Sequence, residues 1–266
     1  MAKKISARTA RSARTSRTAR TRTAPRPNNP NSVILYEGPS QLDGRTPIVV
    51  IATGLQTSST NSKTGAMVQT YIIRSDMAPL AAVMAGADGG ICGGCPHRLN
   101  LKTGVRTCYV NLGKAPRGIY KAYKARRYAK ASATDPRFQG ASIRFGAYGD
   151  PAAAPLELWQ TLATMASLTT GYTHQWRAAK FSGLSDLVQA SCETASDVVK
   201  ANAKGYGTFR VLPQGEAIPK RALHCPASAE RGKVTDCASC GACDGSGRNV
   251  AIHAHGASGR RYLPTL

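Results

Sequence analysis

The sequence predicts an α/β protein whose mostly parallel sheet forms a partial or distorted (β/α) barrel, preceded by a few antiparallel strands and a disordered basic tail. From residue 107 onward, strand-like runs alternate with helical stretches, which is typical of βαβ units. Three earlier strand-like runs are separated only by Gly-, Asn- and Ser-rich clusters, which favours antiparallel connections. The tail is predicted from composition, because residues 1–31 contain nine Lys or Arg and no acidic residue.

The tail comes first along the chain and has a regular pattern of charge. Arginine recurs every third residue, at Arg8, Arg11, Arg14, Arg17 and Arg20. Three-residue spacing drifts around a helix, and no bulky apolar side chain is available for burial, so we expect this segment to be disordered alone. Unbroken runs of one charge sign are commonly interaction segments, which favours a phosphate-binding arm. The alternative is a solubilising tail with no specific partner.

Residues 32–266 are predicted to form a single α/β domain with two cysteine-rich loops, at 88–110 and 225–247. The first strands are expected at VILY (33–36), PIVVIAT (47–53) and MVQTYIIR (67–74), followed by a short helix at 78–87. Later strands are expected at TCYV (107–110), SIRFGAY (142–148), LVQAS (187–191), GTFRVL (207–212) and NVAIHAHG (249–256), and helices at 116–130, 154–167 and 193–204.

Charge and hydropathy restrict the partners and the compartment. The net charge is +22, and 27 basic against 14 acidic residues remain after the tail is left out, which predicts a polyanionic partner, most often nucleic acid. No apolar run is long enough to cross a bilayer, and no apolar segment follows the basic N-terminus, so we expect a cytoplasmic protein without a membrane partner. In a reducing compartment, eight cysteines in tight pairs indicate metal sites rather than disulfides.

The second cysteine-rich loop carries a metal-binding pattern. Three of its cysteines are spaced C-x₂-C-x₂-C and a fourth lies upstream in a Cys-Pro pair; the set is Cys225, Cys237, Cys240 and Cys243. Three closely spaced thiolates with a distant Cys-Pro suit an iron–sulfur cluster, although bacterial ferredoxins place the distant cysteine downstream. The same four sulfurs could bind a tetrahedral zinc ion. An iron–sulfur cluster is the favoured interpretation, zinc is the alternative, and thiols without metal are the third.

The first cysteine-rich loop contains Cys92, Cys95 and Cys108, with glycines that allow the chain to fold tightly round a metal. Three cysteines are one short of a closed site, and His97 or Cys192 could supply the fourth ligand. A three-cysteine site with an open position would let the metal meet a substrate. The alternative is two structural cysteines and one core cysteine.

Polar residues follow several predicted strands. In a parallel α/β sheet, side chains just past the carboxyl ends of the strands converge on one mouth. Four residues placed in this way are candidates for catalysis, namely Asp150, His174, Arg210 and His253. Together they would form a polar pocket with acid–base capacity. Individually, each also has a structural interpretation, such as helix capping by Asp150.

A second basic segment, at 114–130, contains seven Lys or Arg with three tyrosines between them. One side of this predicted helix could pack through Ile119 and Tyr123 while the other side meets phosphate, and aromatic residues among basic ones can stack on unpaired bases. The candidate nucleic-acid contacts here are Lys121, Lys124, Arg126 and Arg127. The alternative is a solvated basic helix.

Several of these motifs occur together in a fixed order. The stretches CGGCPHR…TCYVN, RFGAYGDP, GYTHQW, HCPAS and CASCGAC…VAIHAHG resemble a family of uncharacterised proteins encoded by bacteriophages and plasmids. The resemblance spans about residues 88 to 256 and implies a mobile-element protein in the cytoplasm of a bacterial host. The family is similar in layout to cysteine-cluster α/β barrels, remotely of the radical-SAM kind, although the C-x₃-C-x₂-C motif of those enzymes is absent. The resemblance favours metal binding and implies no substrate.

Two functions of different classes follow from these patterns. The first is a metal-cluster enzyme or redox protein that acts on or near nucleic acid, with iron–sulfur favoured. The second is a non-enzymatic DNA- or RNA-binding protein whose loops are stabilised by zinc. The sequence leaves the reaction, the substrate, the choice between DNA and RNA, and the oligomeric state open.

Overall fold

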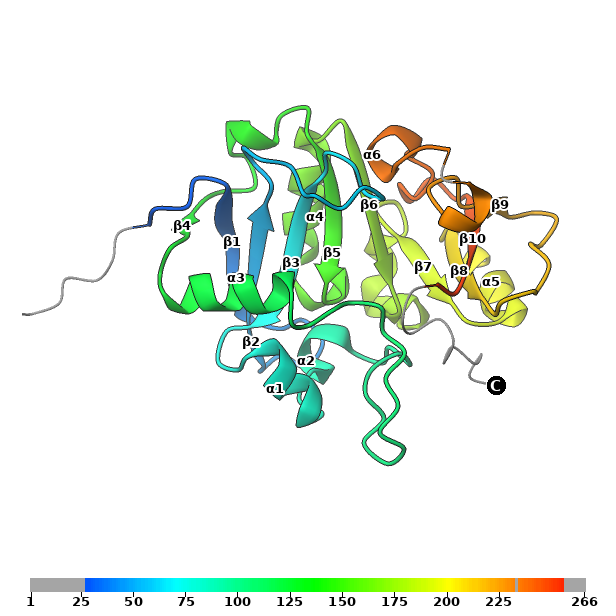
Figure 1. Cartoon of the computed structure of the whole chain (residues 1–266), viewed down its shortest axis with the longest axis horizontal. Coiled ribbons are helices and arrows are strands. Elements are labelled where there is room, and N and C mark those ends of the chain that lie inside the picture. Colours follow the sequence, from blue (N-terminus) through cyan, green and yellow to red (C-terminus); the bar gives the residue numbers. More distant parts are fainter. Residues whose placement is uncertain (1–26, 233, 256–266) are drawn as a thin grey trace, which may run out of the picture.

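The computed structural model describes residues 27–232 and 234–255, and these form one ten-stranded sheet (Figure 1). The strand order across the sheet is β4-β1-β2-β3-β5-β6-β7-β8-β10-β9. The strands are β1 (Ser32–Pro39), β2 (Pro47–Thr53), β3 (Val68–Arg74), β4 (Ala129–Lys130), β5 (Ser142–Tyr148), β6 (Leu168–Thr173), β7 (Gln189–Cys192), β8 (Thr208–Leu212), β9 (Leu223–His224) and β10 (Asn249–His253).

The sheet is mixed in the way that the sequence predicts. Strands β1, β2 and β3 pair antiparallel, and every other neighbouring pair is parallel. The sheet does not close, because β4 and β9 are its two edges. The predicted partial, barrel-like α/β fold with an antiparallel start is therefore confirmed.

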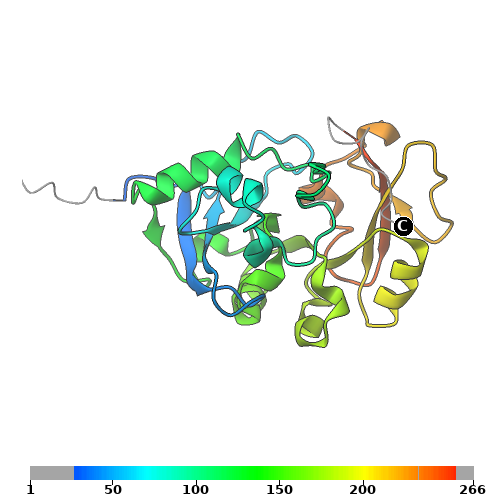
Figure 2. The same cartoon turned by 90° about the horizontal axis from the view of Figure 1, so that it is seen from below.

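Helices lie on both faces of the sheet. Figure 2 shows α3 on one side and α4 and α5 on the other. The α-helices are α1 (Pro79–Met84), α2 (Gly89–Cys92), α3 (Ala115–Lys124), α4 (Leu156–Met165), α5 (Ala195–Asn202) and α6 (Cys237–Cys240). The 3₁₀ turns are η1 (Pro136–Phe138), η2 (Pro151–Ala153), η3 (Gln175–Arg177), η4 (Ala179–Leu184) and η5 (Ala229–Arg231).

The central strands are apolar because both of their faces are covered. In β2, residues 48–52 are all buried between β1 and β3, which explains its continuous apolar run. In β5, Ile143 and Phe145 are fully buried, and the ring of Phe145 lies 4.8 Å from that of Trp159 in α4. Because side chains alternate along a strand, Arg144 points to the opposite face, away from α4.

That opposite face differs along the sheet. Over β1 to β3 it is covered by α3, whose buried Ile119 faces the core. Over β5 to β10 it is hollow and is overlaid by the two cysteine-rich loops. A second, smaller apolar core lies under the C-terminal loop and consists of Cys225, two alanines, Val250 and Ile252. The polypeptide thus leaves a cavity on one face of its own sheet.

Three expected elements differ from the structure. Residues 107–110, expected as a strand, form no regular element, because their loop folds on itself and Cys108 N donates to His97 O at 3.0 Å. The helix expected at 116–130 ends at Lys124, since Arg126 adopts a left-handed φ of 55° and the chain then pairs with the edge of β1 as β4. Residues 168–173 form β6, a strand whose bounds were not predicted although His174 was expected to follow a strand end.

The arginines of the predicted arm (Arg8, Arg11, Arg14, Arg17 and Arg20) lie outside the described residues. Asn28 and Asn29, just after that segment, donate their backbone N–H groups to Arg127 O at 3.2 Å, so the chain enters the fold beside β4. Among the described helices, none has the length and apolarity that a membrane span requires.

Candidate functional site

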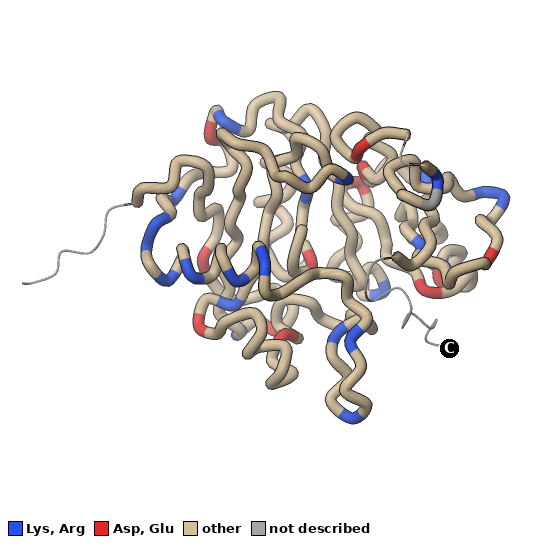
Figure 3. The backbone as a smooth tube through the Cα atoms, viewed as in Figure 1, with Lys and Arg blue, Asp and Glu red and all other residues tan. Residues whose placement is uncertain are grey.

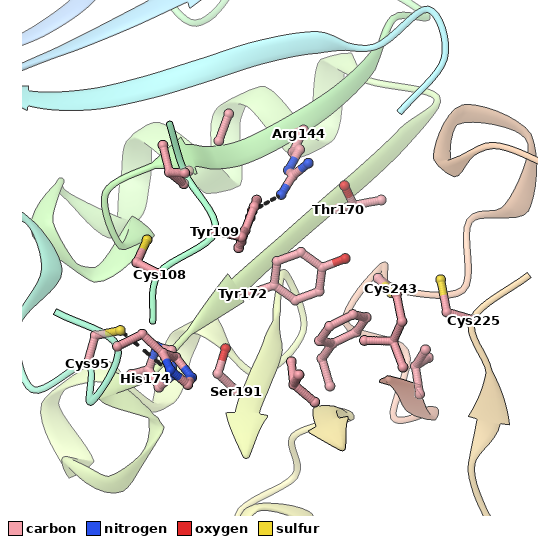
Figure 4. Close-up of a pocket in the computed structure, with 18 of the residues that line it drawn as sticks. Cys95, Cys108, Tyr109, Arg144, Thr170, Tyr172, His174, Ser191, Cys225 and Cys243 are labelled. Carbon is pink, nitrogen blue, oxygen red and sulfur yellow. Dashed lines mark hydrogen bonds between the residues drawn. The ribbon is translucent and has the colours of Figure 1, made fainter. Parts of the chain in front are cut away.

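The hollow face of the sheet holds a cavity of about 450 Å³. Alternate residues of four strands line it: Arg144 from β5, Thr170 and Tyr172 from β6, Phe209 from β8 and Val250 from β10 (Figure 4). These residues share one face because side chains of a strand alternate between the two faces of a sheet. The volume lies within the range of about 300–1,000 Å³ that is usual for ligand sites.

Both cysteine sets reach this one cavity, although more than 100 residues separate them. Cys92, Cys95 and Cys108 line it from the first loop. The C-terminal set lines it from the other loop, through Cys225, Cys237, Cys240 and Cys243. Figure 4 shows Cys95 and Cys108 on one side of Tyr172 and Cys225 and Cys243 on the other.

The first loop is shaped by a short helix and an arginine. Cys92 ends α2, and Gly93 reverses the chain with a φ of 55°, a conformation that favours glycine. Arg98 then ties the loop together: it donates to Asp88 Oδ1 at 2.7 and 2.9 Å and to the carbonyls of Gly86 and Gly93. Burial, and then the neighbouring thiol of Cys95, raise the pKa of the Cys92 thiol well above its usual value. Buried thiols of this kind become thiolates when a cation binds them.

The C-terminal loop is organised around α6. Asp236 caps this helix by accepting from Ser239 N at 2.9 Å, and Gly241 ends it with a φ of 64°. The loop docks on the β2–β3 connection, where Cys237 N donates to Lys63 O at 2.9 Å. Burial and then the other three cysteines of the set raise the pKa of the Cys243 thiol to about 12, against the opposing effect of a hydrogen bond with Tyr172. The four thiols are therefore close enough to act on one another.

Cys192, considered as a ligand for the first set, also lines the cavity, but it does so from β7 and not from either cysteine-rich loop. It ends β7 and is buried. Burial and then the charges of Glu193 and Asp197 raise the pKa of its thiol to about 12. The charges of Arg177 and Arg210 act in the opposite direction. Its electrostatic neighbours are carboxylates and guanidinium groups, whereas those of Cys92 and Cys243 include other thiols.

Two histidines and a glutamate meet at the end of the cavity where Cys95 lies. His174 Nε2 lies 2.9 Å from Glu193 Oε1 and 3.9 Å from Cys95 Sγ. His97 Nε2 lies 3.7 Å from the same Glu193 oxygen, and its Nδ1 lies 2.8 Å from Thr107 Oγ1. The ligand atoms of His97, His174 and Glu193 all fall within 4.8 Å of one another, a spacing that could hold a metal ion. His97 thus faces His174 and Glu193 as well as the cysteine loop.

These three groups have different charges because their neighbours differ. Burial lowers the pKa of His174, but Cys95 and Glu193 outweigh it and raise the value to about 10. Burial and then the adjacent His174 lower the pKa of His97 to about 4, although Glu193 acts in the opposite direction. Burial raises the pKa of Glu193, and the hydrogen bond and charge of His174 more than reverse this. The arrangement is a His174–Glu193 ion pair beside a neutral His97.

Of the four predicted catalytic residues, Asp150 and His174 line the cavity. Asp150 is buried and accepts from Thr173 Oγ1 at 2.7 Å, His174 N at 2.9 Å and Ala152 N at 3.0 Å. Burial raises the pKa of its carboxyl, and these hydrogen bonds partly offset that. Asp150 thus caps the turn that follows β5 and holds the backbone of His174 in place.

Arg210 and His253 do not line the cavity, so the expected convergence of all four residues is wrong for these two. Their strand neighbours Phe209 and Ile252 point into the cavity, and alternation turns Arg210 and His253 to the other face. There both contact Glu216: Arg210 Nη2 donates to its carboxylate at 3.0 Å, and His253 Nε2 lies 2.7 Å from its backbone O.

Sequence reasoning missed three residues that shape the cavity. Arg144, Tyr109 and Tyr172 all line it, and Arg144 Nη2 donates to Tyr109 Oη at 2.6 Å. A signal was present for Arg144, since a charged residue between two buried aromatic or aliphatic positions of a strand must face something polar. For Glu193 the available signal was its position directly after the end of β7.

The basic segment around α3 is exposed where the candidate contacts lie. Lys121, Lys124, Arg126 and Arg127 are all exposed, and Figure 3 shows basic residues along α3 and the turn that follows it. The tyrosines pack inward instead: Tyr128 is buried, and Tyr123 Oη donates to Glu37 at 2.8 Å. This surface offers positive charge without exposed aromatic rings from Tyr123 or Tyr128.

No protein-family model, curated protein or solved structure matches this chain.

Proposed function

We propose that this protein is a metal-cluster enzyme or redox protein that works next to nucleic acid, with iron–sulfur chemistry favoured over zinc. One observation carries the proposal: two cysteine sets that are distant in the sequence open on a single cavity. A purely structural role would not require both sets to face the same cavity, whereas chemistry on a bound substrate would.

The donor sets fit two centres of different kinds. Cys92, Cys95 and Cys108 provide three sulfurs, and a centre held by three protein ligands keeps a position for substrate. The C-terminal set provides four sulfurs and suits a closed centre. When bound, such centres would supply electron transfer or Lewis-acid activation. The small apolar core under the C-terminal set supports this assignment, because few bulky side chains order that loop.

The protein residues beside the first set suit proton transfer. His174 Nε2 can hold a proton between Glu193 and the cavity, and Asp150 fixes the backbone from which the imidazole projects. A buried imidazole next to a carboxylate is a common acid–base arrangement. In this proposal His174 is the acid–base group and Asp150 is a positioning residue.

The nucleic-acid part of the proposal rests on charge. The basic residues of the α3 surface are exposed, and the net charge of the whole chain is +22. Both features favour phosphate contacts. The resemblance described above would imply the cytoplasm of a bacterial host, where thiols stay reduced and available for metals.

A zinc-stabilised DNA- or RNA-binding protein is the second candidate, and the His97, His174 and Glu193 group favours it. Two imidazoles and a carboxylate are ordinary zinc ligands, and Cys95 lies within 3.9 Å of His174. In that case the cavity would be a by-product of loops folded by metal, and the exposed basic surface would be the functional part.

Anaerobic purification followed by metal and sulfide analysis separates the candidates. We expect iron and acid-labile sulfide in the wild type, with absorption in the thiolate-to-iron region. Cys95→Ser and Cys240→Ser should each remove one centre, and Cys192→Ala is the control that should retain both. Zinc without sulfide supports the second candidate. A wild-type protein without any bound metal contradicts both.

A further inference from the structure

Arg144 is a half-buried cation that lines the cavity. Its side chain extends from β5 between the two cysteine-rich loops, where Nη2 donates to Tyr109 Oη at 2.6 Å (Figure 4). The guanidinium carbon lies 5.8 Å from the centroid of the Tyr172 ring. The Nε–H group is buried and has no hydrogen-bond acceptor among the described residues. Burial alone would lower the pKa of Arg144, but Tyr109, Tyr172 and Cys237 raise it, so the side chain stays protonated.

No carboxylate of the described chain neutralises this charge. The acidic groups that line the cavity are already engaged: Asp88 by Arg98, Glu193 by His174, and Asp150 by Thr173 and backbone N–H groups. Withdrawing an unpaired charge from water, even in part, is unfavourable. A protein that keeps such a charge in a cavity commonly uses it for a ligand of opposite charge.

The walls around Arg144 describe the rest of that ligand. Tyr172, Phe209, Val211, Val250 and Ile252 line the cavity beside it. A second guanidinium, that of Arg106, also lines the cavity and donates to the carbonyls of Cys108 and Val110. The cavity wall is therefore apolar where β8 and β10 form it. It carries positive charge at Arg144 of β5 and at Arg106.

We propose that the cavity binds a small organic anion, with its carboxylate or phosphate group on Arg144 and its apolar body against β8 and β10. A guanidinium has a planar fork of donors that pairs with either group through two hydrogen bonds. Arg144 lies close to Tyr109, which follows Cys108, and to Cys237, so the anion would lie between the two cysteine sets. This inference names the substrate class of the proposed function, and its catalytic meaning rests on that function.

Calorimetric titration of anaerobically prepared protein tests the inference. The probes are phenyl phosphate, benzoate and the uncharged benzyl alcohol, and the metal content of each sample is measured beside the titration. We expect the wild type to bind at least one anion and to bind benzyl alcohol much more weakly. Comparing the two anions distinguishes a phosphate from a carboxylate ligand. Arg144→Met should weaken anion binding about ten- to a hundredfold, as expected for loss of charge-assisted hydrogen bonds.

Arg248→Met is the matched control, because Arg248 is exposed and does not line the cavity, and it should bind like the wild type. If Arg144→Met does not fold, Arg144→Lys is used instead. It keeps the positive charge but lacks the planar guanidinium, and it should bind the anion severalfold more weakly than the wild type. Equal anion affinity in the folded Arg144 variant and the wild type overturns the inference, as does absent binding. Loss of metal from Arg144→Met with anion binding intact also overturns it, since Arg144 would then serve the cysteines. Metal-free protein that binds anions through Arg144 upholds the inference and refutes the metal centres.

Discussion

At the residue scale, Asp150 illustrates how a buried carboxylate positions a neighbouring group. Its oxygens accept hydrogen bonds from a hydroxyl and from backbone N–H groups, including that of His174. Asp150→Asn keeps the size of the side chain but turns an NH₂ group toward one of these donors. We expect the free energy of unfolding to fall by about 1–3 kcal/mol, which is the usual cost of a buried donor left unsatisfied. Urea unfolding followed by circular dichroism measures this.

Asp186→Asn is the control for that experiment, because Asp186 is exposed. It should change the free energy of unfolding by less than about 0.5 kcal/mol, as most surface substitutions do. If both variants are equally stable, the hydrogen bonds around Asp150 do not hold the turn that carries His174.

At the element scale, Arg98 holds the first cysteine loop in shape through Asp88 and two backbone carbonyls. Arg98→Met leaves the buried Asp88 carboxylate without its partner, so we expect a loss of about 2–3 kcal/mol and faster cleavage within residues 88–110. Limited proteolysis with chymotrypsin and mass spectrometry locate the cuts. Lys102→Met, in the exposed tip of the same loop, should be cleaved like the wild type. Matching cleavage patterns in the two variants would show that Arg98 is dispensable.

The C-terminal cysteine loop is the second element with a testable stability. The loop contributes only Cys225 and two alanines to its small core, so metal–thiolate bonds are expected to supply its ordering free energy, which reaches about 10 kcal/mol in small structural zinc sites. Cys240→Ser should lower metal content by one centre and open residues 225–247 to protease. Cys192→Ala should do neither, because Cys192 belongs to β7 and not to this loop. A protease-resistant, metal-free loop in the wild type would contradict the expectation.

At the scale of the whole molecule, we expect the positive charge of the chain to determine its affinity for the proposed nucleic-acid partner. Removing residues 1–27 takes away nine basic residues. Each neutralised phosphate releases about 0.7–0.9 of a counterion, so the logarithmic dependence of binding on salt should flatten by several units. Fluorescence anisotropy of labelled single- and double-stranded oligonucleotides across a salt series measures this.

Changing Lys121, Lys124, Arg126 and Arg127 to Gln in the full-length chain should flatten the same slope by fewer units, because it removes fewer charges. A second variant changes Lys200, Lys204 and Arg248 to Gln. Comparing its salt slope with that of the first variant tests whether the position of the removed charges matters as well as the total charge. If truncation leaves the salt slope unchanged, the basic tail does not bind phosphate.

Much of the sheet follows from local patterns. The runs 47–53 and 142–148 form strands with the predicted bounds, because alternating or continuous apolar residues can be buried only in such a sheet. Residues 168–173 were missed because their threonines and glycine gain strand structure only from pairing between β5 and β7. The helix expected to reach residue 130 stops early because Ala129 and Lys130 pair with the edge of β1 as a short parallel strand.

The sequence by itself determined the α/β class, the two sets of cysteines, the excess of positive charge and the strand ends that carry Asp150 and His174. Only the tertiary structure decided that both cysteine sets face one cavity, that Arg144 lies inside it, and that Arg210 and His253 point away. The physical reason is that alternation along a strand tells which residues share a face, but the packing of distant helices decides which face is filled and which stays hollow. Here α4 and α5 filled one face, and the two loops closed over the other.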